Sequence, residues 1–455
     1  MSKNKMQSGY VDLEEKSYIF TYDGELLQLV PKEQNSIKAY DFVKNRNICL
    51  EILEGTTIGQ ERIFFLNCSL KVNLSGYTAK PAGFVCFDGA ERCFDTITFK
   101  GGIIDHFYRA NNIVDEKNTC YNYYNGGGGE IRLKKFDEIS KESEVEIDGR
   151  KAQLKLSVTL PGEPIRMQVD YNLGKPRSFL KLYFEEKVDV IYFRTIYMWI
   201  YNLMVFINFR KSIRLGEMTL GKINEKGKNE PIAFVYINEL EKEDIVDIEQ
   251  IIGYYFVFDH INELIQIVNR KDLNLLFIPK NLKGGKHVTH ESYMICCTSF
   301  ESVFNYVFPN AKTEYSQKAN EVKDEFLQFI MKKDEEYRGV DSKKRKEFKK
   351  YADMIKLLDF GLGEKFEHCQ SLYDNLIANY RDAVLSRFKL SEKEIDEMPN
   401  KFADMRNMLM HSSLEELDNI HICAYTLIRA YIYVMIMKKA NIEDGLIIQA
   451  IDKIL

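Results

Sequence analysis

The spacing of apolar residues changes near residues 281–285 (NLKGG), and this change limits the folds open to the chain. Before this point, short apolar runs alternate with turn-forming residues, which is typical of β-strands. After it, apolar residues recur three and four positions apart, which is typical of amphipathic helices. A chain of 455 residues is also too long for a single hydrophobic core. We therefore expect an α+β protein of several domains, with a β-rich N-terminal region followed by an all-α helical bundle.

Three regions follow from this pattern. Residues 1–180 are expected to be β-rich, residues 181–284 to be a mixed α/β region that forms one unit with the first, and residues 285–455 to be the bundle. Strands are predicted from apolar runs bounded by turn formers, at residues 63–66, 83–87, 151–159, 232–237 and 273–279. The four glycines at residues 126–129 lack the GK[ST] ending and following helix of a phosphate-binding loop, so we interpret them as a hairpin connection.

One segment, residues 190–209 (VIYFRTIYMWIYNLMVFINF), resembles a membrane span in its composition. Arg194 and Asn202 interrupt it, and its uninterrupted apolar run is shorter than the roughly 18 residues that a span requires. We therefore expect a helix that is buried on most sides and no membrane segment. The N-terminus has no apolar signal region, and the nine cysteines show no CxxC pair. Both observations favour the reducing cytoplasm.

The helical region carries several signals for where its helices begin and end. A first helix is expected over residues 290–308, and a second is marked by Val322, Phe326, Phe329 and Ile330. Ser391 with Glu394 has the form of a capping box, and Pro399 suits the start of the next helix. Ser413 with Glu416 is a second capping box, which predicts a helix break just after His411. A final helix carries the apolar positions Ile420, Cys423, Leu427, Val434 and Met437.

Within this bundle, residues 406–411 (RNMLMH) combine three polar side chains with complementary chemistry. Arg406 is a permanent cation whose planar fork suits a phosphate, His411 can exchange protons near neutral pH, and Asn407 both donates and accepts hydrogen bonds. Together they suit attack of a ribose 2′-hydroxyl on the neighbouring phosphate, a reaction that needs no metal or cofactor. The competing interpretation is a chance motif in which His411 is a hydrogen-bonded packing residue.

The spacing within the motif favours a pair of molecules. Asn407 and His411 are four residues apart and share a helix face, whereas Arg406 and His411 lie about 140° apart around the helix. Such an arginine reaches the same phosphate only by wrapping round the helix or by meeting a second copy. Glu301, in the first predicted helix, either orients a site residue or is a simple boundary position.

The motif and its setting before the last long helix resemble the HEPN domain, a compact bundle with an Rx4–6H motif. Arg406, Asn407 and His411 match this motif, and the bundle resemblance covers about residues 285–455. The whole layout is similar to ApeA-like proteins of bacterial anti-phage defence. The resemblance implies a metal-independent endoribonuclease with RNA as substrate, acting in abortive infection, whose bundles pair to form a composite cleft. We expect the N-terminal region to sense a phage-derived trigger or to regulate the nuclease.

Two other functions remain open from the sequence. One is a catalytically inert HEPN module that dimerises or binds nucleotide. The other is a regulatory RNA-binding protein that uses the basic run at residues 343–350 (KKRKEFKK), for which a solvated helix face is the simpler interpretation. With a net charge of −5, the whole chain is no general nucleic-acid binder. His287 and His290 lack an obvious third ligand, so we expect no metal site there.

Overall fold

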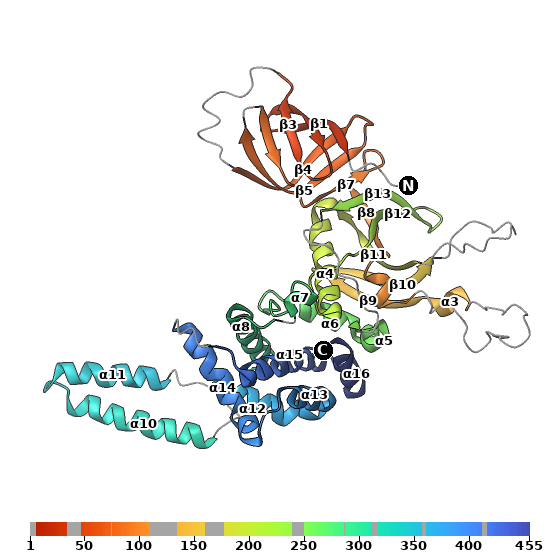
Figure 1. Ribbon diagram of the computed structural model, residues 1–455. Coiled ribbons are helices and arrows are strands. Elements are labelled where there is room, and N and C mark those ends of the chain that lie inside the picture. The colour runs from red at the N-terminus through yellow and green to blue at the C-terminus, as the bar shows by residue number, and fades with distance from the viewer. Residues whose placement is uncertain are drawn as a thin grey trace, which may run out of the picture. The chain divides into compact units, whose positions relative to one another are not determined.

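A computed structural model of the chain forms two compact units, Met1–Asn269 and Arg270–Leu455. The first unit is rich in β-strands and the second is helical, which confirms the predicted α+β class (Figure 1). The structure describes the following residues: 6–33, 47–73, 75–109, 134–159, 177–238, 250–285, 287–311, 317–356, 361–411 and 416–455. The glycines at residues 126–129 and Ser413 lie outside these ranges.

The first strands of the β-rich unit close into an antiparallel barrel. The barrel order is β4–β1–β2–β3–β6–β5, and β4 closes it by pairing with β5 as well as with β1. The bounds of these strands are β1 Gln7–Leu13, β2 Lys16–Tyr22, β3 Leu27–Pro31, β4 Asn47–Thr57, β5 Arg62–Asn73 and β6 Gly76–Ala79. Because closure removes free strand edges, the barrel leaves little backbone unpaired.

Alternating side chains fill this barrel with aromatic rings. Phe20 packs edge-on against Phe65 at 5.2 Å between ring centroids, and Tyr22 packs against Phe65 at 5.6 Å. All three side chains are buried, as the period of two along each strand requires. Gly9 lies where β1 meets β4, and a Cβ atom there would lie 2.0 Å from the carbonyl oxygen of Thr56. Only glycine allows the two backbones to approach so closely.

The sheet continues beyond the barrel through β7, which pairs with β5, in the order β7–β13–β12–β8–β11–β10–β9. The bounds are β7 Gly83–Phe87, β8 Cys93–Lys100, β9 Lys141–Ile147, β10 Arg150–Thr159, β11 Arg177–Asp189, β12 Glu217–Ile223 and β13 Asn229–Ile237. Short helices α2 Ile104–Phe107 and α3 Phe136–Ile139 also belong to this unit. The strands predicted at residues 63–66, 83–87, 151–159 and 232–237 are confirmed.

The aromatic segment forms helix α4 (Phe193–Asn208), preceded by the 3-10 turn Val190–Tyr192. Its second half, from Leu203 to Asn208, is buried, whereas Arg194 and Met198 in its first half are exposed. The expectation of burial on most sides therefore holds for the second half alone. The unit also contains α5 Tyr254–Val257, a 3-10 turn Phe258–His260 and α6 Ile261–Val268, which packs against α4 and β9.

Two helices of the described residues are long and apolar enough to cross a membrane, judged by length and composition. They are Val190–Asn208, with 50% of its apolar window buried inside the protein, and Asn419–Lys439, with 89% buried. Burial among other elements is also what the core helix of a folded bundle requires.

The helical unit is assembled around α15 (Asn419–Lys439), which contacts α8, α12, α13, α14 and α16. The five apolar positions predicted for this helix are all buried, but a further helix, α16, follows it. The other bounds are α7 Leu282–Gly285, α8 His290–Val307, α10 Gln317–Glu336, α11 Ser342–Lys356, α12 Leu362–Tyr373, α13 Ala378–Phe388, α14 Glu392–Met410 and α16 Asp444–Ile454, with a 3-10 turn at Asp374–Leu376.

The strand predicted at residues 273–279 is wrong, because this segment contains no strand and belongs to the helical unit. Side chains satisfy its backbone instead: the Asn274 N–H donates to Ser302 Oγ at 3.2 Å, and the Leu276 N–H donates to Asn274 Oδ1 at 2.9 Å. Phe277 packs edge-on against Tyr433 of α15. The apolar run therefore reflects docking onto helices, and the two units divide between Asn269 and Arg270 instead of at residues 281–285.

Two expectations about the helices also need correction. Pro399 does not start α14 but lies inside it, because the Ser391–Glu394 capping box already begins the helix at Glu392. Val322, Phe326 and Phe329 are not core positions, since they are 53%, 56% and 54% exposed on α10. Among the described residues, α10 packs extensively only against α11, so a helical hairpin of this size leaves much of its apolar stripe uncovered.

Candidate functional site

The motif lies on the last turns of α14. Ser391 Oγ accepts the Glu394 N–H at 3.4 Å, and Glu394 Oε2 accepts the Ser391 N–H at 2.8 Å, so the predicted capping box is present. The helix ends at Met410, and the His411 N–H donates to the carbonyl oxygens of Asn407 and Met408 at 3.2 and 3.1 Å. The end of α14 agrees with the predicted break just after His411, but Glu416 is not helical and α15 begins at Asn419, so α15 does not begin with the predicted capping box of Ser413 and Glu416. Helix α15 is capped by Asp418, whose side chain accepts the Ile420 and His421 N–H groups.

One face of α14 anchors the motif to the bundle. Met398, Phe402 and Met405 are fully buried on this face. Phe402 packs against Tyr293 of α8 at 5.3 Å and against Phe366 of α12 at 5.7 Å. The Tyr293 hydroxyl also donates to the Phe402 carbonyl oxygen at 3.2 Å. Because the buried face is held at three positions, the polar residues that follow Met405 have a defined orientation at the edge of the bundle.

Arg406 is held by two oxygen atoms while part of its side chain remains accessible. One guanidinium nitrogen donates to Asn407 Oδ1 at 3.2 Å, and another donates to Glu301 Oε2 at 3.4 Å. The Arg406 side chain is 34% exposed and the Glu301 side chain 30%. Glu301 comes from α8, so of the two interpretations of this residue the contact favours the one in which it orients a site residue.

A second cation shares the Glu301 carboxylate. Lys365 Nζ of α12 lies 3.7 Å from Glu301 Oε1, its side chain is only 11% exposed, and it also lies 5.8 Å from the centre of the Phe304 ring. One carboxylate thus faces two cations, which leaves a local excess of positive charge beside Arg406. Such an excess attracts a phosphate. Sequence reasoning missed Lys365, and its spacing from the motif contains no signal that could have identified it.

His411 is exposed at the end of α14, as is Asn407. Among the residues that the structure describes, no hydrogen bond or ion pair joins the His411 imidazole to Arg406 or Asn407. The fold therefore brings together Arg406, Asn407, Glu301 and Lys365 within one chain, and leaves His411 outside this cluster. This arrangement matches the angular offset between Arg406 and His411 expected from the sequence.

A second histidine flanks the break. His421 Nδ1 lies 2.6 Å from Asp418 Oδ1, its side chain is 8% exposed, and its ring meets Tyr293 edge-on at 6.4 Å. Sequence reasoning missed this residue, although an aspartate three positions before a histidine at a helix start is a visible signal. Because it is buried and contacts the capping residue of α15, His421 is a packing residue at the start of that helix.

Cys297 lies beneath the cluster, on α8. Burial raises the pKa of its thiol well above the usual range, and the nearby Cys296 and Glu301 act in the same direction. A thiol with such a pKa stays protonated at neutral pH and is a poor nucleophile. Cys297 is therefore not a candidate nucleophile at this end of the bundle.

No set of three or more His, Cys, Asp or Glu side chains in the described parts of the chain is arranged to hold a metal ion. His287 and His290 belong to no such group. Comparison of the chain with protein-family models, curated proteins and solved structures finds no match.

The β-rich unit has a hollow of its own, about 340 Å³ in volume. Arg194, Trp199 and Asn202 of α4 line one side of it, and Glu51 and Asn67 of the barrel line another. An arginine and a glutamate beside an indole and amide groups suit a small polar ligand that carries a flat ring. Trp199 is the only tryptophan of the chain, so its fluorescence reports directly on this hollow.

Proposed function

We propose that the protein is a metal-independent endoribonuclease of the HEPN type. In this mechanism Arg406 neutralises the scissile phosphate, Asn407 positions the phosphate or His411, and His411 shuttles protons. The ribose 2′-oxygen loses its proton and attacks phosphorus, and the bond to the 5′-oxygen breaks as that oxygen takes up a proton. The products are a 2′,3′-cyclic phosphate and a 5′-hydroxyl.

The observation that carries this proposal is the orientation and exposure of the Arg406 guanidinium. An arginine that served only packing would bury its stem or pair fully with one carboxylate. Here the guanidinium is oriented by Glu301 and Asn407, remains one third exposed, and shares its carboxylate with Lys365. A pre-oriented, accessible and incompletely neutralised guanidinium is what recognition of a phosphate requires.

The proposal includes a pair of molecules with two-fold symmetry. Because no hydrogen bond or ion pair joins His411 to Arg406 in the described part of the chain, the cluster of one chain does not include the proposed proton shuttle. A second copy related by a two-fold axis supplies one, since a symmetric pair brings equivalent surfaces together. The active form is then a homodimer or a higher oligomer with composite clefts.

We assign the β-rich unit a sensing or regulatory role, with a phage-derived molecule as trigger and abortive infection in the cytoplasm as the outcome. The hollow lined by Arg194 and Trp199 supports a ligand-binding role for this unit. Titration of candidate triggers against the intrinsic fluorescence of Trp199 tests it, because a ligand seated in the hollow changes the surroundings of the indole.

Sequencing of the RNA ends produced by the purified protein tests the activity. We expect 2′,3′-cyclic phosphate or 3′-phosphate ends, cleavage that survives EDTA, and resistance of a substrate that carries 2′-deoxyribose at the cleaved position. Products with 3′-hydroxyl ends, or activity lost in EDTA, would instead identify a metal-dependent hydrolase with its site elsewhere.

The competing function is a catalytically inert module that dimerises or binds nucleotide. It predicts self-association without RNA cleavage, and expression in cells that does not arrest growth. Growth arrest that disappears in His411→Ala separates the nuclease from this alternative.

A further inference from the structure

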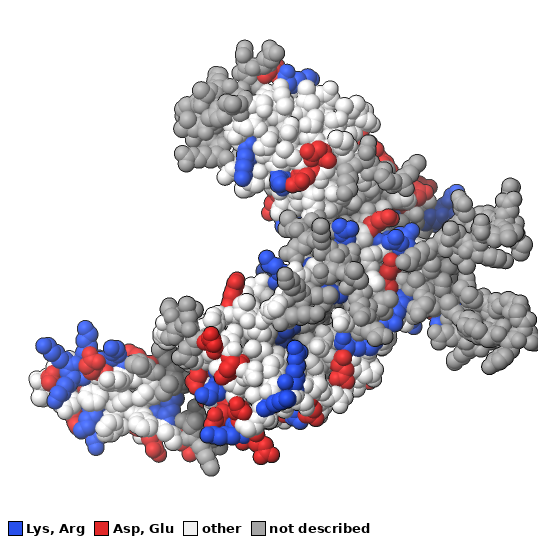
Figure 2. All heavy atoms as spheres, viewed as in Figure 1, with Lys and Arg blue, Asp and Glu red and all other residues white. Residues whose placement is uncertain are grey.

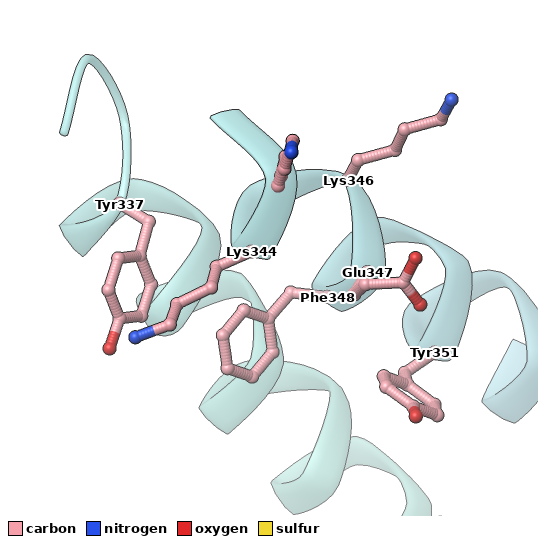
Figure 3. Close-up of a pocket in the computed structure, with 7 residues that line it drawn as sticks. Tyr337, Lys344, Lys346, Glu347, Phe348 and Tyr351 are labelled. Carbon is pink, nitrogen blue, oxygen red and sulfur yellow. The ribbon is translucent and has the colours of Figure 1, made fainter. Parts of the chain in front are cut away.

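The helical hairpin formed by α10 and α11 carries a hollow that the proposed catalytic cluster does not use. The hollow has a volume of about 540 Å³. It is lined by three aromatic side chains, three lysines and one acidic residue: Tyr337, Phe348, Tyr351, Lys343, Lys344, Lys346 and Glu347. Figure 3 shows the three rings in a row, with the Lys344 amine beside the ring of Tyr337.

The three aromatic rings lie one after another along the hairpin. Tyr337 and Phe348 stack at 5.7 Å between centroids with an angle of 12° between their planes. Tyr351 follows Phe348 by three residues, which is close to one helical turn, and it is 54% exposed. Aromatic side chains of this kind are usually buried, so an accessible row of them suits a ligand with rings of its own.

The charges around this hollow are unbalanced. Helix α11 contains seven Lys or Arg residues against two Asp or Glu residues, and the hairpin from residue 317 to 356 as a whole carries a net charge of +3, whereas the whole chain carries −5. Figure 2 shows these basic side chains, with acidic ones among them, over the hairpin. A segment with a net positive charge in an otherwise acidic protein favours a polyanionic partner.

The lysines of the hollow differ from three other basic residues of the hairpin, which are held in ion pairs. Arg345 pairs with Asp334 at 3.1 Å, Lys333 with Glu336 at 2.6 Å and Arg338 with Glu335 at 3.6 Å. In the described part of the chain, no carboxylate lies within ion-pair distance of the three lysines of the hollow, and the Lys344 amine lies over the Tyr337 ring, at 5.2 Å. Their charges are therefore available to a ligand.

We propose that this aromatic and basic hollow binds single-stranded RNA, and that it holds the substrate of the proposed nuclease. Bases would stack on the rings of Tyr351 and its neighbours, and backbone phosphates would contact the lysines. This combination of a stacking platform with lysines is the usual means of binding single strands without sequence preference. An acidic protein partner would use the lysines alone, and the row of rings favours RNA over it. The inference deepens the proposed function and names where its substrate is held.

The test measures binding of the full-length protein to a fluorescent single-stranded RNA whose riboses are all 2′-O-methylated. Such an RNA cannot undergo 2′-hydroxyl attack, so binding is read without cleavage. Tyr351→Ala should weaken binding roughly 5- to 100-fold, whereas Tyr351→Phe, which keeps the ring, should bind as the wild type does. Phe329→Ala is the matched control, because Phe329 is equally exposed on the same hairpin but does not line the hollow.

The lysines are tested by their salt dependence. Replacement of Lys343, Lys344 and Lys346 by glutamine should reduce the slope of log affinity against log salt by up to about 2, because each phosphate that a lysine neutralises adds roughly 0.7 to this slope. The same change at Lys226 and Lys228, exposed in the turn between β12 and β13, should leave the slope unchanged. Melting curves and circular dichroism check that each variant folds.

Three outcomes would overturn the inference. They are wild-type affinity in both the Tyr351→Ala and the triple-lysine variants, equal losses in the control variants, and binding of a polyglutamate peptide as tight as RNA and insensitive to Tyr351→Ala. These readouts do not depend on cleavage. If RNA binds through the hollow but is never cut, the hollow is an RNA-binding site, and both the nuclease proposal and the role of the hollow in holding its substrate fail.

Discussion

The carboxylate of Glu301 provides the sharpest test of the candidate site. Glu301→Gln keeps the shape of the side chain and one hydrogen-bond acceptor but removes the negative charge between two cations. Arg406 lies 3.4 Å from one of its oxygens and Lys365 lies 3.7 Å from the other. We expect the guanidinium to lose its preferred orientation while both cations remain.

The cost in stability should be small. Because Glu301 and Arg406 are each about one third exposed, solvent screens their attraction, and exposed pairs of this kind contribute about 0.2–1 kcal/mol. The more buried Lys365 adds a contribution of similar size. We expect the free energy of unfolding to fall by about 1 kcal/mol, or the melting temperature by about 2–4 °C.

The effect on cleavage should be larger than the effect on folding. Loss of the oriented fork should lower kcat by roughly 10- to 100-fold, since misplacement of a positioned group costs rate. KM should stay level or fall, because the phosphate then meets two cations with no opposing carboxylate. Glu397→Gln on α14 is the matched control, since it removes the same charge from an exposed pair with Lys393 at 3.6 Å.

Steady-state cleavage of a fluorogenic RNA, together with thermal melting, separates these effects. Wild-type kcat in Glu301→Gln would refute the role of Glu301 in orienting Arg406. A loss of folding in this variant would instead identify a structural ion pair. A parallel loss of activity in Glu397→Gln would show that any change of charge on the bundle is harmful.

Three further predictions follow from the same structure. His411→Ala should slow cleavage roughly 10²- to 10⁴-fold, and Arg406→Lys should also lower activity because the planar fork is lost. Since both residues are partly or fully exposed, the melting temperatures of these variants should stay within a few degrees of the wild type. Sedimentation should find a dimer at micromolar concentration, and full activity in a strict monomer would refute the composite site. An equal mixture of inactive Arg406→Ala and His411→Ala chains should regain up to about one quarter of the wild-type rate. Half of the dimers are then mixed, and each mixed dimer holds one intact composite site out of two. In the β-rich unit, burial and the nearby Lys155 lower the pKa of Lys181 to about 8, so its charge penalises folding below that pH and the penalty fades as the pH rises toward the unfolded value. Lys181→Met should therefore stabilise this unit by about 2 kcal/mol at pH 7, with a gain that shrinks toward pH 10 in denaturant titrations.

Features set by neighbouring residues could be predicted from the sequence. The β-rich and helical halves, the capping box of Ser391 and Glu394, and the helix end at His411 all depend on contacts within a few residues. Local patterns failed where long-range packing decides. The apolar run at residues 273–279 has the composition and length of a strand, yet it docks on α8 and α15. The stripe on α10 has the period of a core helix, yet among the described residues α10 packs extensively only against α11, and Val322, Phe326 and Phe329 stay exposed.

The residues of the candidate site also fall into those that local sequence indicates and those that only the fold brings together. The sequence could single out Arg406, Asn407 and His411 as candidates because their chemistry is recognisable within six residues. It left Glu301 ambiguous and gave no sign of Lys365. Glu301 on α8 reaches Arg406, and Lys365 on α12 reaches Glu301, only through the fold. A charged residue on a helix is ordinarily a solvated one, so its burial beside another charge cannot be inferred from composition alone.

The separation of Arg406 from His411 has a kinetic consequence. Five residues of helix advance about 7.5 Å along the axis and turn about 140°, and the contact with Glu301 holds the guanidinium toward α8. His411 ends the same helix, exposed, with its imidazole joined to neither Arg406 nor Asn407. If the complete site forms only when two chains meet, the specific activity must fall as the protein is diluted below its dimerisation constant. Such a nuclease is controlled by anything that changes the pairing of the bundles, and the attached β-rich unit can act on cleavage through this equilibrium without touching the site.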